Sequence, residues 1–347
     1  MHRISIIIPV YNVAPYLREC LNSVVKAAEQ VKVRGEGEGE GGGGQWKDSP
    51  LVEVICVDDG STDGSGEILD EYASTFQPSN LSTFQPFNLS TFRVIHQQNA
   101  GVSVARQVAL EQCTGEWIAA VDPDDWVEPD YFATLLEATT AGDVDMVWGG
   151  FTEEREGGAH VDRQKVASDY KTQVLALLDG SLWGGMCMRL INRQFVRRHQ
   201  LGFPKMRVAA CEDTLFVASA LAAGARVRHA DTVGYHYRIR TDSSVHRKED
   251  LQAFLSLMAI ADRLEMTVRE DWAAEPLRIW RKERLRSPYL DESIPDDVFF
   301  AHNGACKDLW GSHAPFHHKL TYWFAARGWR RSLVKMVALM RKRRTVK

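Results

Sequence analysis

Three carboxylates follow an apolar run within four positions, in the stretch AAVDPDDW (119–126). They are Asp122, Asp124 and Asp125. Two unit charges about 4 Å apart repel by roughly 1 kcal/mol in water and by roughly 4 kcal/mol at an effective dielectric constant near 20. A solvated loop tolerates such a cluster, whereas a cluster that lines a cleft requires positive charge beside it. The stretch is therefore a candidate binding site for a cation.

Polar residues also end two earlier apolar runs. ISIIIPV (4–10) leads through Pro9 to Tyr11, and VEVICVDDG (52–60) contains Asp59 at its end. Ligands of open parallel sheets bind outside the carboxyl ends of the strands, so we expect all three clusters on one edge of a sheet. Acids and an aromatic ring on one rim predict a site for a divalent cation and an anionic ligand with a stackable base. Hard oxygen ligands of this kind suit Mg2+ or Mn2+.

The elements that must position these residues follow from the hydrophobic pattern. Apolar runs alternate with helical patterns in the first half of the chain, which predicts an α/β fold with a mainly parallel sheet flanked by helices. Continuous β-branched runs are typical of strands buried on both faces. The predicted strands are 4–10, 52–60, 92–97, 116–122 and 145–151. The predicted helices are 17–28, a helix after Gly101, 131–138 and 170–178.

Two low-complexity segments interrupt this pattern. RGEGEGEGGGG, near 34–48, and the duplicated STFQPSNL and STFQPFNL, near 74–91, are predicted to be surface insertions. The repeat is too short for a solenoid, whose units run to about 20 residues or more. The pattern becomes helical from about residue 246. The sequence therefore predicts one domain over 1–245 and a helical C-terminal region over 246–347.

The composition restricts the class of protein. A chain of 347 residues with 44% hydrophobic residues can bury a large core, and a net charge of −4 does not indicate a nucleic-acid partner. Six scattered cysteines without a CxxC pair are typical of reduced thiols. We recognise neither a signal peptide nor an apolar run of the roughly 18 residues that span a membrane. We therefore expect a cytoplasmic protein.

The C-terminal segment 316–347 has an unusual charge distribution. It carries ten Lys or Arg and no Asp or Glu, together with aromatic and aliphatic residues. Such a segment either docks on an acidic surface of its own domain or lies on an anionic membrane, where each cation adds roughly 1 kcal/mol. We hypothesise peripheral contact with the inner face of the membrane.

Five motifs together resemble glycosyltransferase family 2, the inverting enzymes with a GT-A fold. In chain order they are SIIIPVYN, VDDGSTDGS, NAGVSVAR, GEWIAAVDPDDW and CED. Each motif alone has an ordinary explanation, such as a polar turn or a helix cap, but the five in one order do not. The resemblance covers roughly residues 3–245 without the insertions. It implies metal-dependent transfer from a nucleotide-diphosphate sugar, by default a UDP-sugar, to a saccharide or lipid-linked acceptor in surface polysaccharide biosynthesis.

The resemblance also implies roles for single residues around the acidic stretch. Asp122 would face the ribose and sugar, and Asp124 would hold the metal. Asp213, in CED, falls at the position of the general base, with its neighbour Glu212 as the alternative. His236, in YHYRIRTDSS (235–244), would assist the metal.

The nucleotide would be held by residues from several motifs. Pro9 and Tyr11 would flank and stack on the base, and Asp59 would contact the base or ribose. Arg106 would help to hold the nucleotide. The diphosphate would be approached by Arg238 and Ser244.

Alternatives stay open at this point. Arg106 is also explained as a salt-bridge residue, and His236 as a plain hydrogen-bonded histidine. A catalytically inactive nucleotide-sugar-binding or scaffold protein would carry many of the same residues. A nucleotidyltransferase would require a glycine-rich, basic phosphate loop after the first strand, which PVYNVAPYL does not supply.

Overall fold

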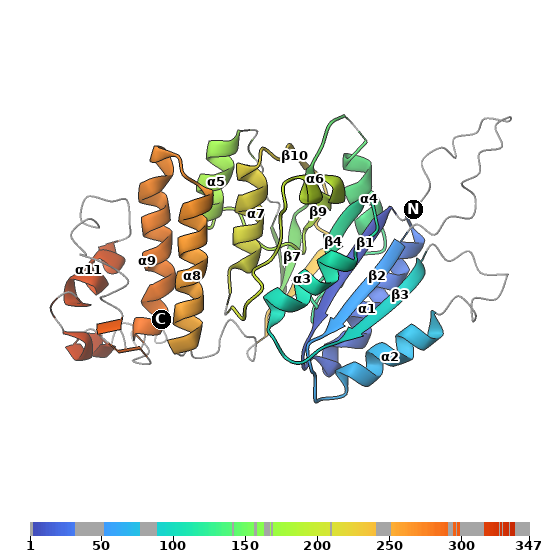
Figure 1. Cartoon of the computed structure of the whole chain (residues 1–347), viewed down its shortest axis with the longest axis horizontal. Helices are drawn as coiled ribbons and strands as arrows, with labels where there is room; N and C mark the ends of the chain where they lie inside the picture. The colour runs from blue at the N-terminus through green and yellow to red at the C-terminus, as the bar shows by residue number, and fades with distance from the viewer. Residues whose placement is uncertain are drawn as a thin grey trace. The chain divides into compact units, whose positions relative to one another are not determined.

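The computed structural model divides the chain into two compact units, Met1–Arg207 with Glu212–Thr241 and Val208–Cys211 with Asp242–Lys347 (Figure 1). The structure describes residues 3–31, 52–76, 89–140, 142–155, 158–162, 167, 169–208, 210–240, 251–290, 294–295, 297–298, 316–325, 327, 329–332 and 334–336. The predicted insertion near 34–48 and the predicted site residue Ser244 lie outside the described residues.

The first unit is built on a seven-stranded sheet of order β10-β6-β9-β4-β1-β2-β3. The adjacent strands β4, β1, β2 and β3 run parallel to one another, and β10 runs parallel to β6. Strand β9 is antiparallel to both of its neighbours, β4 and β6. Every residue of β1 and β2 is buried, as the continuous apolar runs predict. The strands are β1 (Ile4–Val10), β2 (Val52–Asp58), β3 (Leu89–His96), β4 (Trp117–Ala120), β6 (Met146–Trp148), β9 (Arg189–Asn192) and β10 (Val227–His229).

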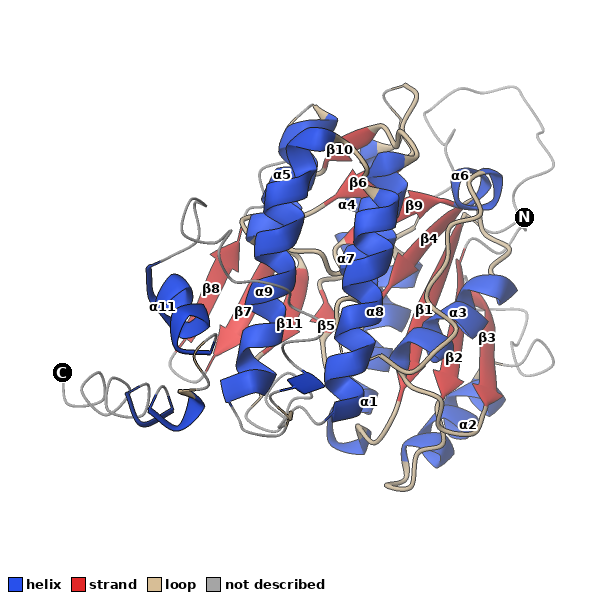
Figure 2. Ribbon diagram, turned by 60° about the vertical axis from the view of Figure 1, so that its left-hand side comes forward, coloured by secondary structure: helices blue, strands red, loops and turns tan. Residues whose placement is uncertain are grey.

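Helices cover both faces of this sheet (Figure 2). Alternate residues of β1, beginning with Ile4 and Ile6, share one hydrophobic cluster with the buried side of α1. Helix α3 packs on β1 and β2 through buried residues that include Ala105 and Ala109. The helices of this unit are α1 (Ala14–Glu29), α2 (Ser65–Thr75), α3 (Val102–Gln112), α4 (Tyr131–Ala138), α5 (Tyr170–Asp179), α6 (Arg193–Arg198) and α7 (Glu212–Ala222).

A second, four-stranded sheet has the order β5-β11-β7-β8. Its strands are β5 (Trp126–Val127), β7 (Phe151–Arg155), β8 (Gly158–Asp162) and β11 (Tyr235–Arg238). Strand β11 is antiparallel to β5, where His236 pairs with Trp126, and parallel to β7. The acidic residues 122–125 therefore join the end of β4 in the large sheet to the start of β5 in the small one.

The predicted α/β class is confirmed. Strand 4–10 and helix 131–138 have the predicted ends, and the other predicted strands and helices, apart from strand 145–151, are present with shifted ends. The prediction of one strand over 145–151 is wrong, because Gly149 and Gly150 lead the chain from β6 into β7 of the other sheet. Gly150 donates its N–H to Thr232 at 2.8 Å in this crossing. Of the insertion predicted near 74–91, residues 77–88 lie outside the described residues, while α2 continues to Thr75 and β3 begins at Leu89.

The second unit is helical where it is described. Its elements are α8 (Leu251–Thr267), the short 3-10 helix η2 (Asp271–Ala273), α9 (Ala274–Leu290) and α11 (Phe316–Ala325). Phe254, Leu257 and Met258 of α8 form a small core with Ile294. Among the described residues, no helix combines the length and the hydropathy that crossing a bilayer requires.

Candidate active site

The carboxyl ends of β1, β2 and β4 lie at one edge of the large sheet. Across β1 and β2, Pro9 pairs with Val57, and the Asp59 N–H donates to the Val10 carbonyl at 2.8 Å. On the other side of β1, Ile7 pairs with Ala120 of β4 in the parallel register. Extending this register by two residues puts Asp122 at the level of Pro9. The parallel strands thus bring the three polar clusters to one rim.

The turn after β1 presents Tyr11 to solvent. Its side chain is 42% exposed, whereas Pro9 is buried. Asn12 adopts a left-handed conformation (φ 51°), which asparagine tolerates better than most residues. Its Oδ1 accepts a hydrogen bond from the Thr62 N–H at 2.8 Å, and its own N–H donates to the Ser61 Oγ at 3.1 Å. These bonds fix the turn after β1 to the turn after β2.

Asp59 is almost completely buried, with 2% of its surface exposed. Its carboxylate accepts hydrogen bonds from the Gln97 side chain at 2.7 Å and from the Ala100 and Gly101 N–H groups at 2.7 and 2.8 Å. Asp59 therefore holds the loop that leads into α3. Its predicted contact with a base or ribose stays a prediction.

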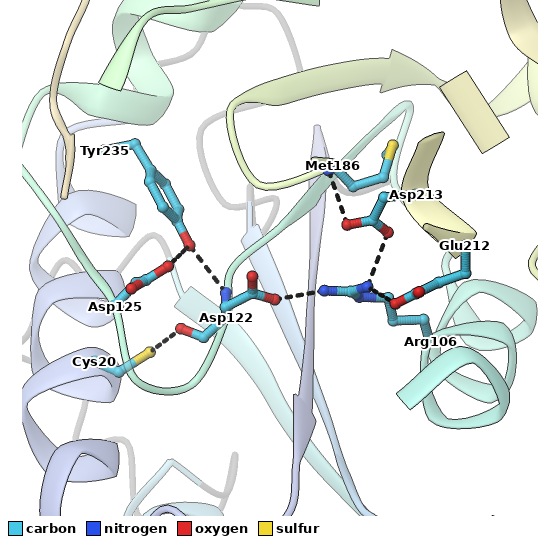
Figure 3. A network of polar contacts seen from close by, with 8 residues as sticks. All are labelled: Cys20, Arg106, Asp122, Asp125, Met186, Glu212, Asp213 and Tyr235. Atoms are coloured by element: carbon cyan, nitrogen blue, oxygen red, sulfur yellow. Dashed lines mark hydrogen bonds and ion pairs between the residues drawn. The ribbon is translucent and has the colours of Figure 1, made fainter. Parts of the chain in front are cut away.

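Arg106 binds three carboxylates at once (Figure 3). Its Nη1 donates to Glu212 at 2.5 Å and to Asp213 at 2.8 Å, and its Nη2 donates to Asp122 at 2.6 Å. The arginine lies on α3, the two acids begin α7, and Asp122 follows β4. The salt-bridge interpretation of Arg106 thus describes its contacts, and its nucleotide-holding role stays a prediction.

The charge in this cluster is not balanced, since one guanidinium faces three carboxylates. Burial raises the pKa of Asp213 to about 7, and the negative charges of Glu212 and Asp122 act in the same direction. Arg106 and a hydrogen bond from the Met186 N–H, at 3.2 Å from Asp213 Oδ2, work in the opposite direction. A carboxylate with a pKa near neutral pH is well matched to general-base chemistry.

The acidic stretch divides into structural and accessible members. Asp125 is buried, accepts a hydrogen bond from the Tyr235 hydroxyl at 2.6 Å, and accepts another from the Arg238 N–H at 2.8 Å. Asp125 therefore fastens the stretch to β11. Asp124 remains partly exposed, with Arg240 Nε 3.3 Å from its Oδ2. Burial and the neighbouring Asp122 raise the pKa of Asp124.

Arg238 lies beside this stretch. Its Nε donates to the Asp124 carbonyl at 2.9 Å, its Nη2 bonds Glu19 at 2.6 Å, and its guanidinium lies 4.5 Å from the centroid of the Trp126 ring. The sequence motifs did not identify Arg240, whose guanidinium lies over Tyr16 at 4.7 Å. It lies two residues beyond the end of β11, and its charge close to Arg238 in YHYRIRTDSS could have identified it.

The chemistry of Asp122 and Asp124 fits a hard divalent cation. Mg2+ commonly binds one or two protein carboxylates together with phosphate oxygens. Burial first, and then the negative charge of Asp122, raise the pKa of Asp124, and a cation beside both carboxylates would offset that charge. In the part of the chain that the structure describes, no three His, Cys, Asp or Glu side chains form a metal centre. His236 has its ring nitrogens 2.8 Å from Glu154 and 3.1 Å from Glu128. Its ring stacks on Trp126, so its contacts are those of a hydrogen-bonded histidine.

Comparisons with known proteins agree with this arrangement. Residues 5–201 match the family model described as Glycosyl transferase family 2. The chain is 31% identical over 298 residues to a "Putative glycosyltransferase EpsH" of Bacillus subtilis, covering 84% of this chain and 75% of that protein. It is 23% identical over 240 residues to a "Poly(ribitol-phosphate) beta-glucosyltransferase" of Bacillus spizizenii, covering 69% of this chain and 33% of that protein.

A similar solved structure is that of S. aureus TarS in complex with UDP-GlcNAc. Its TM-score is 0.56 at 18% sequence identity, and the match covers 97% of this chain and 92% of that chain. A likeness at this identity concerns the fold alone.

Proposed function

The chain belongs to glycosyl transferase family 2 and has a GT-A fold, and we propose that this glycosyltransferase moves a sugar from a UDP-sugar to a saccharide or lipid-linked acceptor with inversion. A divalent cation, Mn2+ or Mg2+, takes part. The observation that carries the proposal is the partly buried Asp213 carboxylate, bonded to Arg106 beside Asp122 at the carboxyl edge of the sheet. The product belongs to surface polysaccharide synthesis, which the name of the poly(ribitol-phosphate) relative supports.

Asp213 acts as the general base. A sugar hydroxyl is a weak nucleophile at neutral pH, so a carboxylate within hydrogen-bond reach takes its proton as the oxygen attacks the anomeric carbon. This contributes about 10²–10⁴-fold to the rate. Attack from the face opposite the leaving group inverts the anomeric centre in one displacement. The reaction therefore needs one catalytic carboxylate, unlike the paired carboxylates of glycosidases.

The leaving group is a nucleoside diphosphate whose β-phosphate gains negative charge as the bond breaks. A divalent cation bound here would supply Lewis-acid stabilisation for that charge. Asp124 would hold this cation, and Asp122 would orient the ribose and sugar. Arg238, whose guanidinium lies next to the Asp124 backbone, binds the diphosphate, and the role of Ser244 beside it stays a prediction. Arg240 joins them as a third donor of positive charge or hydrogen bonds.

The nucleotide lies along the rim. The exposed ring of Tyr11 stacks on the base, with Pro9 behind it. Asp59 fixes the loop into α3 and contributes to the base or ribose pocket through that loop. A UDP donor is supported by the TarS structures, which were solved with UDP-GlcNAc and with UDP.

The C-terminal segment contacts an anionic membrane, where a lipid-linked acceptor is found. Exposed aromatic side chains support this: Phe316 is 69% exposed and Trp329 is 50% exposed. Arg327 lies 3.8 Å from the centroid of the Trp323 ring, which places a cation beside the aromatic group. Deleting 316–347 should reduce the membrane-bound fraction of the protein on cell fractionation. An unchanged fraction would remove this part of the proposal.

The test of the proposed function is a panel of nucleotide sugars, assayed for hydrolysis and transfer with and without Mn2+. We expect one UDP-sugar to be consumed in a Mn2+-dependent reaction. A protein that binds UDP yet neither transfers nor hydrolyses any donor would instead be a nucleotide-sugar-binding scaffold.

A further inference from the structure

Arg189 is a buried cation that the proposed reaction does not use. It begins β9, pairs with Trp148 of β6, and is 1% exposed. The guanidinium lies 4.6 Å from the centroid of the Trp148 ring, and its Nη2 donates to the Trp183 carbonyl. Within the described residues, its Nε and Nη1 have no hydrogen-bond partner. A buried guanidinium without a bonded carboxylate is costly, so its position calls for a reason beyond stability.

The loop between Trp183 and Arg189 leads directly to Asp213. The Arg189 N–H donates to the Met186 carbonyl at 3.1 Å, and the Met186 N–H donates to Asp213 Oδ2 at 3.2 Å (Figure 3). The Arg189 side chain therefore bonds the start of the loop, at the Trp183 carbonyl, and the Arg189 backbone bonds its middle, at Met186. Met186 in turn bonds the Asp213 carboxylate.

The same loop packs against the helix that carries Asp213. A Cβ atom added at Gly184 would clash with the Thr214 hydroxyl and lie 3.1 Å from the Thr214 Cα. Thr214 follows Asp213 in the first turn of α7. A shift of the loop would therefore change the surroundings of Asp213.

We infer that Arg189 is a positioning residue for Asp213, because it fixes the loop 183–189 so that the Met186 amide bonds the carboxylate and adds a second buried positive charge nearby. The charged and titratable groups facing Asp213 are Arg106 from α3, Glu212 from α7, Asp122 after β4, Cys187 from the loop and Arg189 from β9. Because this set contains two further carboxylates, the positive charge of Arg106 alone does not offset the negative charge around Asp213. The inference rests on the proposed role of Asp213 as the base.

The test is a titration of the Asp213 carboxyl in the full-length protein by 13C NMR, with the signal assigned by its loss in Asp213→Asn. Arg189→Met removes a positive charge and loosens a hydrogen bond to the ionised form. Both changes favour the protonated acid, so its pKa should rise by about one unit. Arg189→Lys keeps the charge and should show a smaller rise. The matched control is Arg193→Met at the start of α6, directly after β9. Arg193 bonds the Gly115 carbonyl, and its loss should leave the titration unchanged.

Gly184→Ala is the second variant, needed if Arg189→Met does not fold. It displaces the loop while keeping Arg189, and it should raise the same pKa. If Arg189→Met and Gly184→Ala both fold and titrate like Arg193→Met, the inference is wrong.

The NMR readout requires no turnover. If Arg189→Met raises the pKa of Asp213 but the wild-type protein is inactive toward every donor, the proposed function is refuted and the inference still stands. In the active enzyme, the pH of half-maximal kcat should rise with the pKa in Arg189→Met, with kcat recovering at alkaline pH and the donor KM unchanged.

Discussion

Asp122 and Asp213 are held by the two terminal nitrogens of one guanidinium. Arg106 Nη2 lies 2.6 Å from Asp122, and Arg106 Nη1 lies 2.8 Å from Asp213. In the proposed reaction these carboxylates face the donor sugar and the acceptor hydroxyl. A rigid, planar arginine between them fixes the distance from which the acceptor attacks.

Replacing Arg106 with methionine should destabilise the protein by about 3–5 kcal/mol at pH 8, because buried carboxylates lose their counter-charge. The loss should shrink at pH 5, where protonated carboxyl groups no longer require a cation. Urea unfolding at both pH values measures this. Arg18→Met is the control, since Arg18 pairs with Glu71 at the surface and its loss should change stability much less. Equal effects of the two substitutions would contradict the buried network.

Asp124→Asn should weaken the binding of Mn2+ in the presence of UDP by at least about tenfold, because a charged oxygen ligand is lost. Electron paramagnetic resonance of free Mn2+ gives the affinity directly. Asp130→Asn, a nearby exposed acid, is the matched control and should bind like the wild type. The metal assignment fails if both variants retain wild-type affinity.

Tyr11→Ala should raise the Kd for UDP by about tenfold, since stacking of a base on an aromatic ring contributes about 1–3 kcal/mol. Isothermal titration calorimetry measures the Kd. Tyr11→Phe keeps the ring and should bind UDP normally. A Phe variant as weak as the Ala variant would show that the hydroxyl, and not the ring, makes the contact.

Strand β1 and the rim residues show what the sequence alone could predict. A continuous apolar run followed by polar residues specifies a buried parallel strand and its carboxyl end, and the five motifs specify the family. The short strands β9 and β11 were not predicted, because four residues carry too little periodicity to be distinguished from a loop.

The partners of Arg106 could not be predicted either. Glu212 and Asp213 lie far from Arg106 in the chain, and only the packing of α7 near α3 brings them together. The spacing of the acids in the sequence also does not reveal that Asp125 is hydrogen-bonded to Tyr235 while Asp124 stays partly exposed. Side-chain partners across elements depend on tertiary packing rather than on local pattern.

His96 should make stability depend on pH. Hydrogen bonds to Asp58 and Asp70 raise the pKa of His96 above its ordinary value of 6.5. Its stabilising contribution is therefore complete below about pH 6.5 and lost as the pH rises through the folded-state value. His96→Asn should lower the free energy of unfolding at pH 6, by less than about 1 kcal/mol because the ring is half exposed, and have less effect at pH 9. Urea unfolding that shows a larger loss at pH 9 would contradict this sign.

The central claim is that Asp213 is the base of a glycosyl transfer, and the pH dependence of kcat in the wild type and in Asp213→Asn tests it most directly. Burial raises the pKa of Asp213 to about 7, so the wild-type rate should rise with pH through that value and level off above it. Asp213→Asn should lose about 10²–10⁴-fold of the rate with UDP binding retained. An Asn variant that transfers sugar at the wild-type rate, with the same pH profile, would contradict the account.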